Sequence, residues 1–309
     1  MHVRLLAALA TVALSIGPAW GWGDEAHKIV CEIATGLLTG EEQREVKALV
    51  GALGRPDGER YAHLATACTF ADTARAKARE QAEAVRQGLP AGAAKLAPWS
   101  RFAALDRWHF LNVGRGARHV PQEACTECVL GAIAFHRKQL ADRTLSPAVR
   151  GEALALLGHW VADAHQPLHV AYEDDRGGNE IDRITGVYEG ARNLHDVWDN
   201  AILARARTAR GLRDWRAYAR LLVSGIDPED RKRWEASDPR AWADESYALA
   251  TEDAFRYCRW EAGTCRALGR ERHLDGSYQA RFQPVMERRL QQAAVRLART
   301  IRDALSSRS

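Results

Sequence analysis

The sequence predicts an all-α protein that folds as a single large helical domain with at most a short β-hairpin. Apolar residues recur at helical spacing along nearly the whole chain. With 46% hydrophobic and 27% charged residues the chain can bury a core, which excludes a disordered or low-complexity protein. A length of 309 residues allows two domains, but no linker is long enough to require them. The net charge of +4 permits an anionic substrate without indicating a nucleic-acid coating protein.

The N-terminal segment predicts export from the cytoplasm. Residues 1–21 combine a short basic start, an apolar run over 5–16 and a small-x-small cleavage site at 19–21. We therefore expect a signal peptide at 1–21 and a mature domain over 22–309 that begins at Trp22. No later stretch approaches about 18 uncharged apolar residues, so we expect a periplasmic or secreted protein with no membrane span.

Helix signals follow one another along the mature chain. Thr39 to Glu42 form a capping box, and Ser146-Pro147 supplies an N-cap and a proline at the first helical position. Residues 88–98, rich in Gly, Ala and Pro, read as a linker. The least helical part is 170–190, where short strands are expected around 180–184 and 187–189. The expected helices cover 24–38, a segment from about 40, 61–88, 126–142, 146–166, 193–208, 212–224, 241–258 and 279–306.

The mature chain contains an even number of cysteines, which in an exported protein favours disulfides. Their short spacings suggest the pairs Cys125–Cys128 and Cys258–Cys265, which leaves Cys31 to pair with Cys68. An alternative for 125–128 is a redox C-x-x-C or half of a zinc ribbon, although no second C-x-x-C accompanies it.

Two histidine-containing segments carry the strongest chemical signal. In residues 158–169, His159 and Asp163 stand four apart, so on a helix they project from one face. His195 and Asp199 repeat this spacing in a second segment. Imidazole nitrogens and carboxylate oxygens on rigid helices are what a zinc site needs, so we expect a central metal cleft in the helical domain.

Structural alternatives exist for several of these residues. His159 and His169 could be hydrogen-bonded core histidines, whereas Asp163 in an apolar helix is costly to bury without a positive partner. His165 lies on another helical face, which favours packing or support of a ligand over ligation. The remaining histidines outside these motifs are interpreted as surface or core residues: His63, His119, His136 and His273.

Together these motifs resemble a known family, the S-one/P-one type zinc-dependent single-strand nucleases. The resemblance covers residues 22–199 and keeps the order of the family's motifs. Zinc-dependent phospholipases C share the fold and most ligands and are the nearest alternative. The matching segments are Trp22-Gly23-x-x-x-His27, Phe70-Ala71-Asp72-x-x-Arg75, Trp108-His109-Phe110, GHWVADAHQPLHV from Gly158, Gly177-Gly178-Asn179, and NLHDVWD from Asn193.

The resemblance implies three zinc ions in the cleft. Trp22 would contribute its free α-amine and its carbonyl oxygen, which requires removal of the signal peptide because an amide nitrogen is a poor donor. Asp163 would bridge two ions. The implied ligand sets are Asp72, His109, His159 and Asp163 for the first ion, His169, His195 and Asp199 for the second, and Trp22, His27 and Asp163 for the third.

The resemblance also implies a phosphodiesterase acting on single-stranded DNA, RNA and nucleotides, with 5′-phosphate products and 3′-nucleotidase activity. Arg75 and Asn179 would act on the phosphate at the catalytic centre, beside Asp72. Phe110 and Tyr188 are candidates for base stacking. Several family members carry Asp three residues after the ligand histidine, where this chain has Asn112, so base preference would differ.

Two other functions stay open at this point. A zinc phospholipase C would need an apolar rim, and its second carboxylate is typically Glu, whereas Asp199 stands in this chain. A periplasmic zinc-binding protein would use the same ligands but would have no need of Arg75. We expect a monomer.

Overall fold

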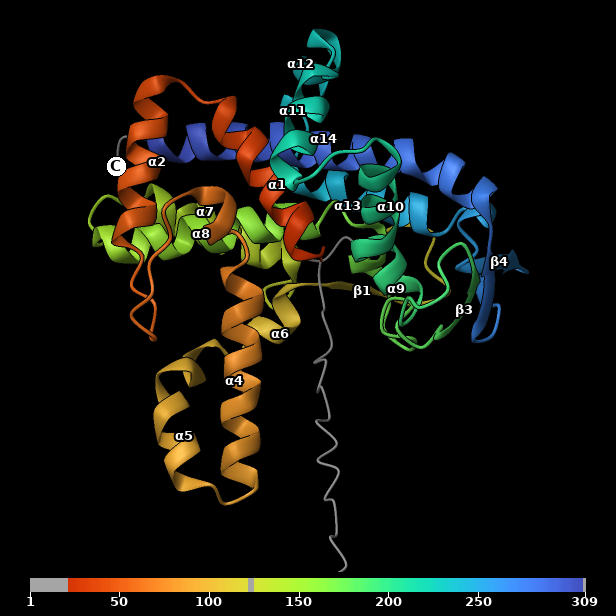
Figure 1. The fold of residues 1–309 in the computed structure, drawn as a ribbon, viewed down its shortest axis with the longest axis horizontal. Coiled ribbons are helices and arrows are strands. Elements are labelled where there is room, and N and C mark those ends of the chain that lie inside the picture. Colours follow the sequence, from red (N-terminus) through yellow and green to blue (C-terminus); the bar gives the residue numbers. More distant parts are fainter. Residues whose placement is uncertain (1–21, 122–124, 308–309) are drawn as a thin grey trace, which may run out of the picture.

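The computed structural model describes residues 22–121 and 125–307 and is dominated by helices, which confirms the expected fold class (Figure 1). The expected signal peptide, 1–21, lies outside the described residues. The first half of the chain contains α1 (Asp24–Gly36), α2 (Gly40–Ala52), α3 (Leu64–Ala67), α4 (Phe70–Arg86), α5 (Pro90–Leu96), α6 (Leu105–Trp108), α7 (Val129–Ala141) and α8 (Pro147–Asp163). The second half contains α9 (Leu194–Asp196), α10 (Ile202–Ala209), α11 (Trp215–Ser224), α12 (Pro228–Glu235), α13 (Pro239–Ala250) and α14 (Gly276–Ser306).

Helix α8 forms the centre of the core. Every residue from Ala153 to Asp163 is buried, because α1, α2, α4, α7 and α14 all pack against this helix. A helix that is apolar on all sides belongs in the interior. The 31-residue α14 runs across the whole body in Figure 1 and packs against α1, α7 and α8. Both predicted caps are present, at Thr39 with its reciprocal Glu42 and at Ser146.

The strands form three separate pairs. β1 (Leu111–Val113) lies parallel to β2 (Val170–Tyr172), β3 (Arg183–Gly186) lies parallel to β6 (Glu271–Leu274), and β4 (Cys258–Glu261) forms a hairpin with β5 (Thr264–Ala267). The expected strand near 180–184 therefore exists in part as β3, whereas 187–189 forms a turn. The strand β3 forms no hairpin with its neighbour in sequence, because it pairs with β6, which follows it by more than 80 residues. The hairpin of the described structure is formed by β4 and β5.

Three other expectations differ in detail from the structure. The expected helix over 61–88 is interrupted at Cys68 and Thr69, between α3 and α4. The expected linker over 88–98 contains α5, which begins with Pro90 at its first position, and it continues into a 3₁₀ turn over 97–102. The expected helix over 241–258 ends at Ala250, and α12 was not expected. In Figure 1, α4 and α5 stand side by side and extend away from the body.

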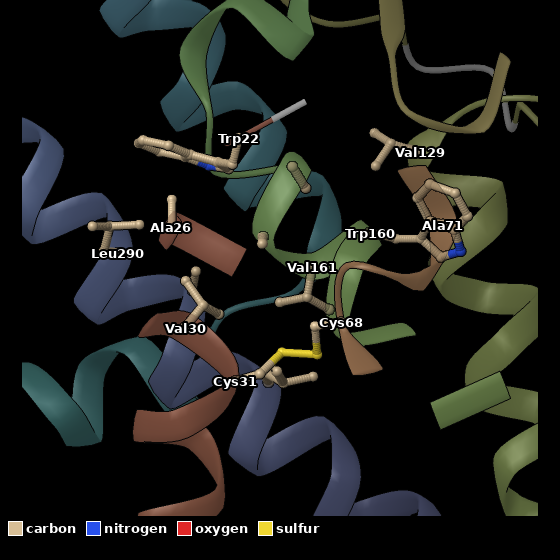
Figure 2. Close-up of a cluster of buried hydrophobic side chains, with 14 of the residues drawn as sticks. Trp22, Ala26, Val30, Cys31, Cys68, Ala71, Val129, Trp160, Val161 and Leu290 are labelled. Carbon is tan, nitrogen blue, oxygen red and sulfur yellow. A yellow bond between two sulfur atoms is a disulfide. The ribbon is translucent and has the colours of Figure 1, made fainter. Parts of the chain in front are cut away.

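The structure forms the three expected disulfides, Cys31–Cys68, Cys125–Cys128 and Cys258–Cys265. Cys31–Cys68 lies among the buried hydrophobic side chains, near Val30 and Val161, as Figure 2 shows. Gly158 on α8 makes room for it, because a Cβ there would lie 2.4 Å from the Cys68 sulfur. This disulfide thus fixes α1 and the start of α4 against the helix that carries His159. No helix among the described residues is long and apolar enough to cross a membrane.

Candidate metal centre

Asp163, at the last turn of α8, is the centre of a buried group of imidazoles. Its Oδ2 atom lies 2.9 Å from Nδ1 of His109 and 3.2 Å from Nε2 of His159. Its Oδ1 atom lies 3.4 Å from Nε2 of His27 on α1. All four side chains are fully buried. The two oxygens of one carboxylate therefore face different histidines, as a ligand shared between two cations would.

Asp72 completes this first group from the start of α4. Its Oδ2 atom lies 3.9 Å from Nε2 of His159. The interruption between α3 and α4 turns the chain at this point, so that Asp72 in the first turn of α4 faces α8. The imidazoles of His27 and His159 are stacked at 3.7 Å. One ligand atom from each of His27, Asp72 and His159 lies within 4.8 Å of the others, and the same holds for His109, His159 and Asp163.

His169, His195 and Asp199 form a second group. Nε2 of His195 lies 3.2 Å from Nε2 of His169 and 3.4 Å from Oδ2 of Asp199. Asp199 lies in a π-helical turn over Val197–Ala201, a local widening of the helix that often occurs at functional sites. Gln166 donates a hydrogen bond of 2.7 Å to Oδ1 of Asp199 and thereby orients the carboxylate.

Backbone carbonyls fix the orientation of three imidazoles. In each, a hydrogen bond from Nδ1–H to a carbonyl oxygen leaves Nε2 with its lone pair directed into the site. The three bonds run from His159 to Cys68 at 2.7 Å, from His169 to His109 at 2.8 Å and from His195 to Gly177 at 2.7 Å. The carbonyl of disulfide-bonded Cys68 thus supports a candidate ligand directly.

Gly177 is required for its carbonyl to reach His195. Its φ of +63° is a left-handed conformation, and a Cβ there would lie 2.3 Å from the carbonyl oxygen of Leu168. Gly177 belongs to a predicted motif, but no role was expected for its carbonyl, and Gln166 was not expected at the site. The position of Gln166 beside Pro167, between two candidate ligands, was the available signal.

The electrostatics of the site fit a bound cation. Burial lowers the pKa of His27, His109 and His169 well below the ordinary value, and lowers that of His195 to about 4, so these imidazoles are neutral. Burial also lowers the pKa of His159, but the Asp163 and Asp72 carboxylates outweigh it and raise that pKa. The acids shift upward: burial raises the pKa of Asp163 to about 6 and that of Asp199 well above its usual range.

Several of these buried atoms find no hydrogen-bond partner within the described part of the chain. They are Nδ1 and Nε2 of His27, Nε2 of His109, Oδ1 of Asp163 and Oδ2 of Asp199. Leaving such atoms unpaired costs about 1–3 kcal/mol each, so their clustering requires an explanation. Neutral nitrogens with carboxylate oxygens are the donors that Zn²⁺ prefers, and the residues present therefore fit a divalent cation.

Comparison with known proteins assigns the fold and these motifs to a family. The sequence matches the family model described as S1/P1 Nuclease over residues 22–306. The chain belongs to the S1/P1 nuclease family. It is 26% identical to Endonuclease 2 of Arabidopsis thaliana over 97% of this chain and 96% of the relative. It is 29% identical to Endonuclease 3 of the same plant, covering 93% and 90%, and 24% identical to Nuclease S1 of Aspergillus oryzae, covering 96% and 96%.

In this S1/P1 nuclease family member, the N-terminal segment of the described chain lies beside the second group. Gly23 donates its N–H to the carbonyl of Asp199 at 3.0 Å, and a Cβ at Gly23 would lie 1.8 Å from Oδ1 of Asn200. The Trp22 indole is fully buried among Ala26, Leu290 and other core side chains (Figure 2). The Trp22 side chain is therefore held in the core, and the residue after it is hydrogen-bonded to the backbone of the candidate ligand Asp199.

Of the two residues expected to contact phosphate, Arg75 contacts a candidate ligand of the first group and Asn179 contacts Asn193, two residues before His195. Arg75, 4% exposed, directs Nη2 to Oδ1 of Asp72 at 2.6 Å. Asn179 accepts a hydrogen bond of 3.1 Å from Asn193, near His195, and donates to the carbonyl of Arg176. Arg75 thus places a positive charge beside Asp72, a candidate ligand of the first group.

The residues expected to contact bases are placed differently from one another. The half-buried ring of Phe110 lies 4.8 Å from that of His169, at the second group. Asn112 is exposed on β1. Tyr188 is not brought to the cluster, because it is buried against Tyr278 with its hydroxyl donating to Gln279 on α14.

Proposed function

We propose that this nuclease is an exported, zinc-dependent endonuclease that hydrolyses single-stranded DNA and RNA to 5′-phosphate products and also acts as a 3′-nucleotidase. Family membership supports hydrolysis of nucleic acids, and the relatives carry the names Endonuclease and Nuclease. The observation that carries the proposal is the buried Asp163 carboxylate, whose two oxygens face separate histidines. Such a carboxylate is expected where a cluster of cations is held rather than a single ion.

Three zinc ions would be held by the chain's buried ligands. When bound, zinc lowers the pKa of a coordinated water towards 7 and offsets the charge of a phosphate. The ligands would be Asp72, His109, His159 and Asp163 for one ion, His169, His195 and Asp199 for another, and His27, Asp163 and the α-amine and carbonyl of Trp22 for the third.

Around the metal centre, polar side chains of the chain would bind and orient the scissile phosphate. Arg75 can offer its planar guanidinium to two phosphate oxygens while Asp72 holds it in position. Asn179, fixed by Asn193, can donate to a third oxygen. Both contacts are worth most when the charge on the phosphoryl oxygens grows, so they favour the transition state over bound substrate.

Preference for single strands would follow from the depth of the site. A phosphate in a stacked duplex cannot reach fully buried ligands, whereas an unpaired strand can splay its bases apart. Phe110 beside His169 offers a ring on which one base can stack. Asn112, next along β1, carries both a donor and an acceptor and would accept more than one base.

The proposal is tested on the mature protein beginning at Trp22. We expect about three zinc ions per chain by elemental analysis, and cleavage of single-stranded DNA and RNA in preference to duplex that chelator abolishes. Product ends are identified by mass spectrometry. Hydrolysis of p-nitrophenyl-choline phosphate without cleavage of nucleic acid would indicate a phospholipase C instead. Bound zinc with no turnover of either substrate would indicate a zinc-binding protein.

We also propose that the protein is a periplasmic or secreted monomer. Three disulfides suit an oxidising compartment. A tag fused directly before Trp22 would convert the α-amine to an amide and should abolish turnover while leaving the helical fold, checked by circular dichroism. A tag at the other end of the chain is the control, and full activity of the first fusion would contradict an α-amine ligand.

A further inference from the structure

A surface hollow apart from the metal centre combines aromatic and basic side chains. We call it the Trp260 hollow; its volume is about 310 Å³. It is lined by Arg118, His119, Asp244, Tyr247, Ala248, Thr251 and Trp260. We propose that the Trp260 hollow binds a nucleobase and the adjoining phosphate of a single strand whose cleavage site lies at the metal centre. This inference rests on the proposed function and adds a second contact for long substrates.

The walls of the hollow come from three segments that the fold locks together. Trp260 lies on β4 opposite Cys265 on β5, and the Cys258–Cys265 disulfide closes this hairpin. The N–H of Cys265 donates to the carbonyl of Arg115 at 3.0 Å. From α13, the hydroxyl of Tyr247 donates to the carbonyl of Ala117 at 2.6 Å. The hollow is therefore formed before any ligand arrives, which reduces the entropy lost on binding.

The chemistry of these side chains suits a nucleotide. The guanidinium of Arg118 lies 4.8 Å from the centre of the half-buried Trp260 ring. Indole rings and guanidinium planes both stack with bases, and the exposed Arg118 guanidinium and His119 imidazole can both donate hydrogen bonds to a phosphate. Asp244 accepts from the backbone N–H of Val120 at 3.3 Å and can accept further from an amino group on a base.

The chain connects the hollow with the metal centre directly. Arg118 follows His109 by nine residues, of which the first few form β1 beside β2. A chain of that length spans at most about 30 Å, a distance that several nucleotides of an extended strand can cover. A dinucleotide bound across the metal centre has no further nucleotide to place in the hollow. Only longer strands should gain affinity from it.

A second tryptophan with an arginine over its ring provides the matched control. The Arg216 guanidinium lies 4.2 Å from the centre of the Trp215 ring on α11. The pair has the same chemistry and a similar exposure, with a half-buried Trp215 and an exposed Arg216. If stacking of arginine on tryptophan serves only surface packing, the two pairs will respond alike to substitution.

The experiment compares KM for a long single-stranded oligonucleotide and for a dinucleotide. We expect Trp260→Ala and Arg118→Ala each to raise KM for the long strand about fivefold or more, with kcat and all dinucleotide kinetics unchanged. Trp215→Ala and Arg216→Ala should leave KM unchanged for both substrates. Trp260→Phe keeps a stacking ring and should restore most of the affinity, which separates stacking from damage to the hairpin.

A cross-linking measurement keeps the two proposals distinguishable. A phosphorothioate oligonucleotide carrying 5-iodouracil is irradiated with the zinc-loaded protein, and the attached peptide is identified by mass spectrometry. We expect attachment at Trp260 or Tyr247, lost in Arg118→Ala. Unchanged KM in the Trp260 and Arg118 variants, or attachment elsewhere only, would overturn the inference. Absence of turnover in the wild type together with attachment at the hollow would instead count against the proposed activity alone.

Discussion

Two buried clusters, the candidate metal centre and the residues around His165, meet at the end of α8. They differ in whether the nitrogens of their histidines have hydrogen-bond partners in the protein. His165 lies two residues after Asp163 and is equally buried. It places Nδ1 2.7 Å from the carbonyl of Val161, and its Nε2 lies 2.8 Å from Nη1 of Arg296. Arg296 pairs in turn with both oxygens of Glu245. In the metal centre, by contrast, neither nitrogen of His27 has a hydrogen-bond partner among the described residues.

The difference shows that a pKa direction alone does not identify a ligand. Burial lowers the pKa of His165 well below its ordinary value, just as it does for His27. What separates the two is whether protein groups complete the hydrogen bonding. Both nitrogens of His165 are bonded to protein groups in the His165 cluster, which ties α13 and α14 to the loop after Asp163 and leaves Nε of Arg296 without a partner among the described residues. The metal centre is incomplete without a cation, so removing groups from the two clusters should have different consequences.

The largest effect is expected from Asp163→Asn. An amide offers only one oxygen and no charge, so the affinity for the ions on both sides of residue 163 should fall. We expect activity to be reduced at least about 100-fold. Asp199→Asn is the control, since Asp199 faces only the second group. Elemental analysis should find less zinc in the first variant than in the second. Equal zinc contents would contradict a bridging role.

The buried histidine His136 should make the free energy of unfolding depend on pH. Burial lowers its pKa to about 4, and Trp160 Nε1 lies 3.2 Å from its Nδ1. The unfolded chain takes up this proton near pH 6.5, so the contribution to stability is complete above pH 6.5 and is lost as the pH falls to about 4. Urea unfolding should show the wild type losing about 3 kcal/mol more than His136→Gln over this range. The prediction is wrong if the free energies of unfolding of the wild type and of His136→Gln change equally with pH.

In the His165 cluster, Glu245→Gln should reduce the stability of the fold without affecting metal binding. Arg289 and Arg296, both nearly fully buried, would lose their carboxylate. Breaking a buried pair costs about 3–5 kcal/mol, and we expect about 2 kcal/mol because Glu245 is 37% exposed. Glu152→Gln, which breaks the surface pair with Arg101, should cost less than about 1 kcal/mol. Loss of zinc in Glu245→Gln would remove the distinction between the clusters.

The smallest effect is expected from Gln166→Ala. Gln166 donates a hydrogen bond to the candidate ligand Asp199, and loss of such support typically weakens metal binding about tenfold. The matched variant is Gln292→Ala, because Gln292 accepts a hydrogen bond from Arg289 in the His165 cluster. Competition with a zinc chelator measures both affinities. Equal affinities in the two variants would show that Asp199 needs no support.

Features that depend on local spacing could be predicted from the amino-acid pattern alone. The helical repeat puts His159 with Asp163, and His195 with Asp199, on common faces whatever the rest of the chain does. The same holds for the capping box at Thr39, whose two hydrogen bonds join residues three apart. Close cysteine spacings likewise indicated two of the disulfides and, by elimination, the third.

The folded arrangement sets how distant segments meet. It gave the two oxygens of Asp163 different neighbours, brought the Gly177 carbonyl to His195, and removed Tyr188 from the site by packing it against α14. It also paired β3 with β6 where the pattern suggested a local hairpin. Side-chain periodicity specifies which face of an element is buried, but the partner on that face depends on chain closure over long separations, which no local pattern encodes.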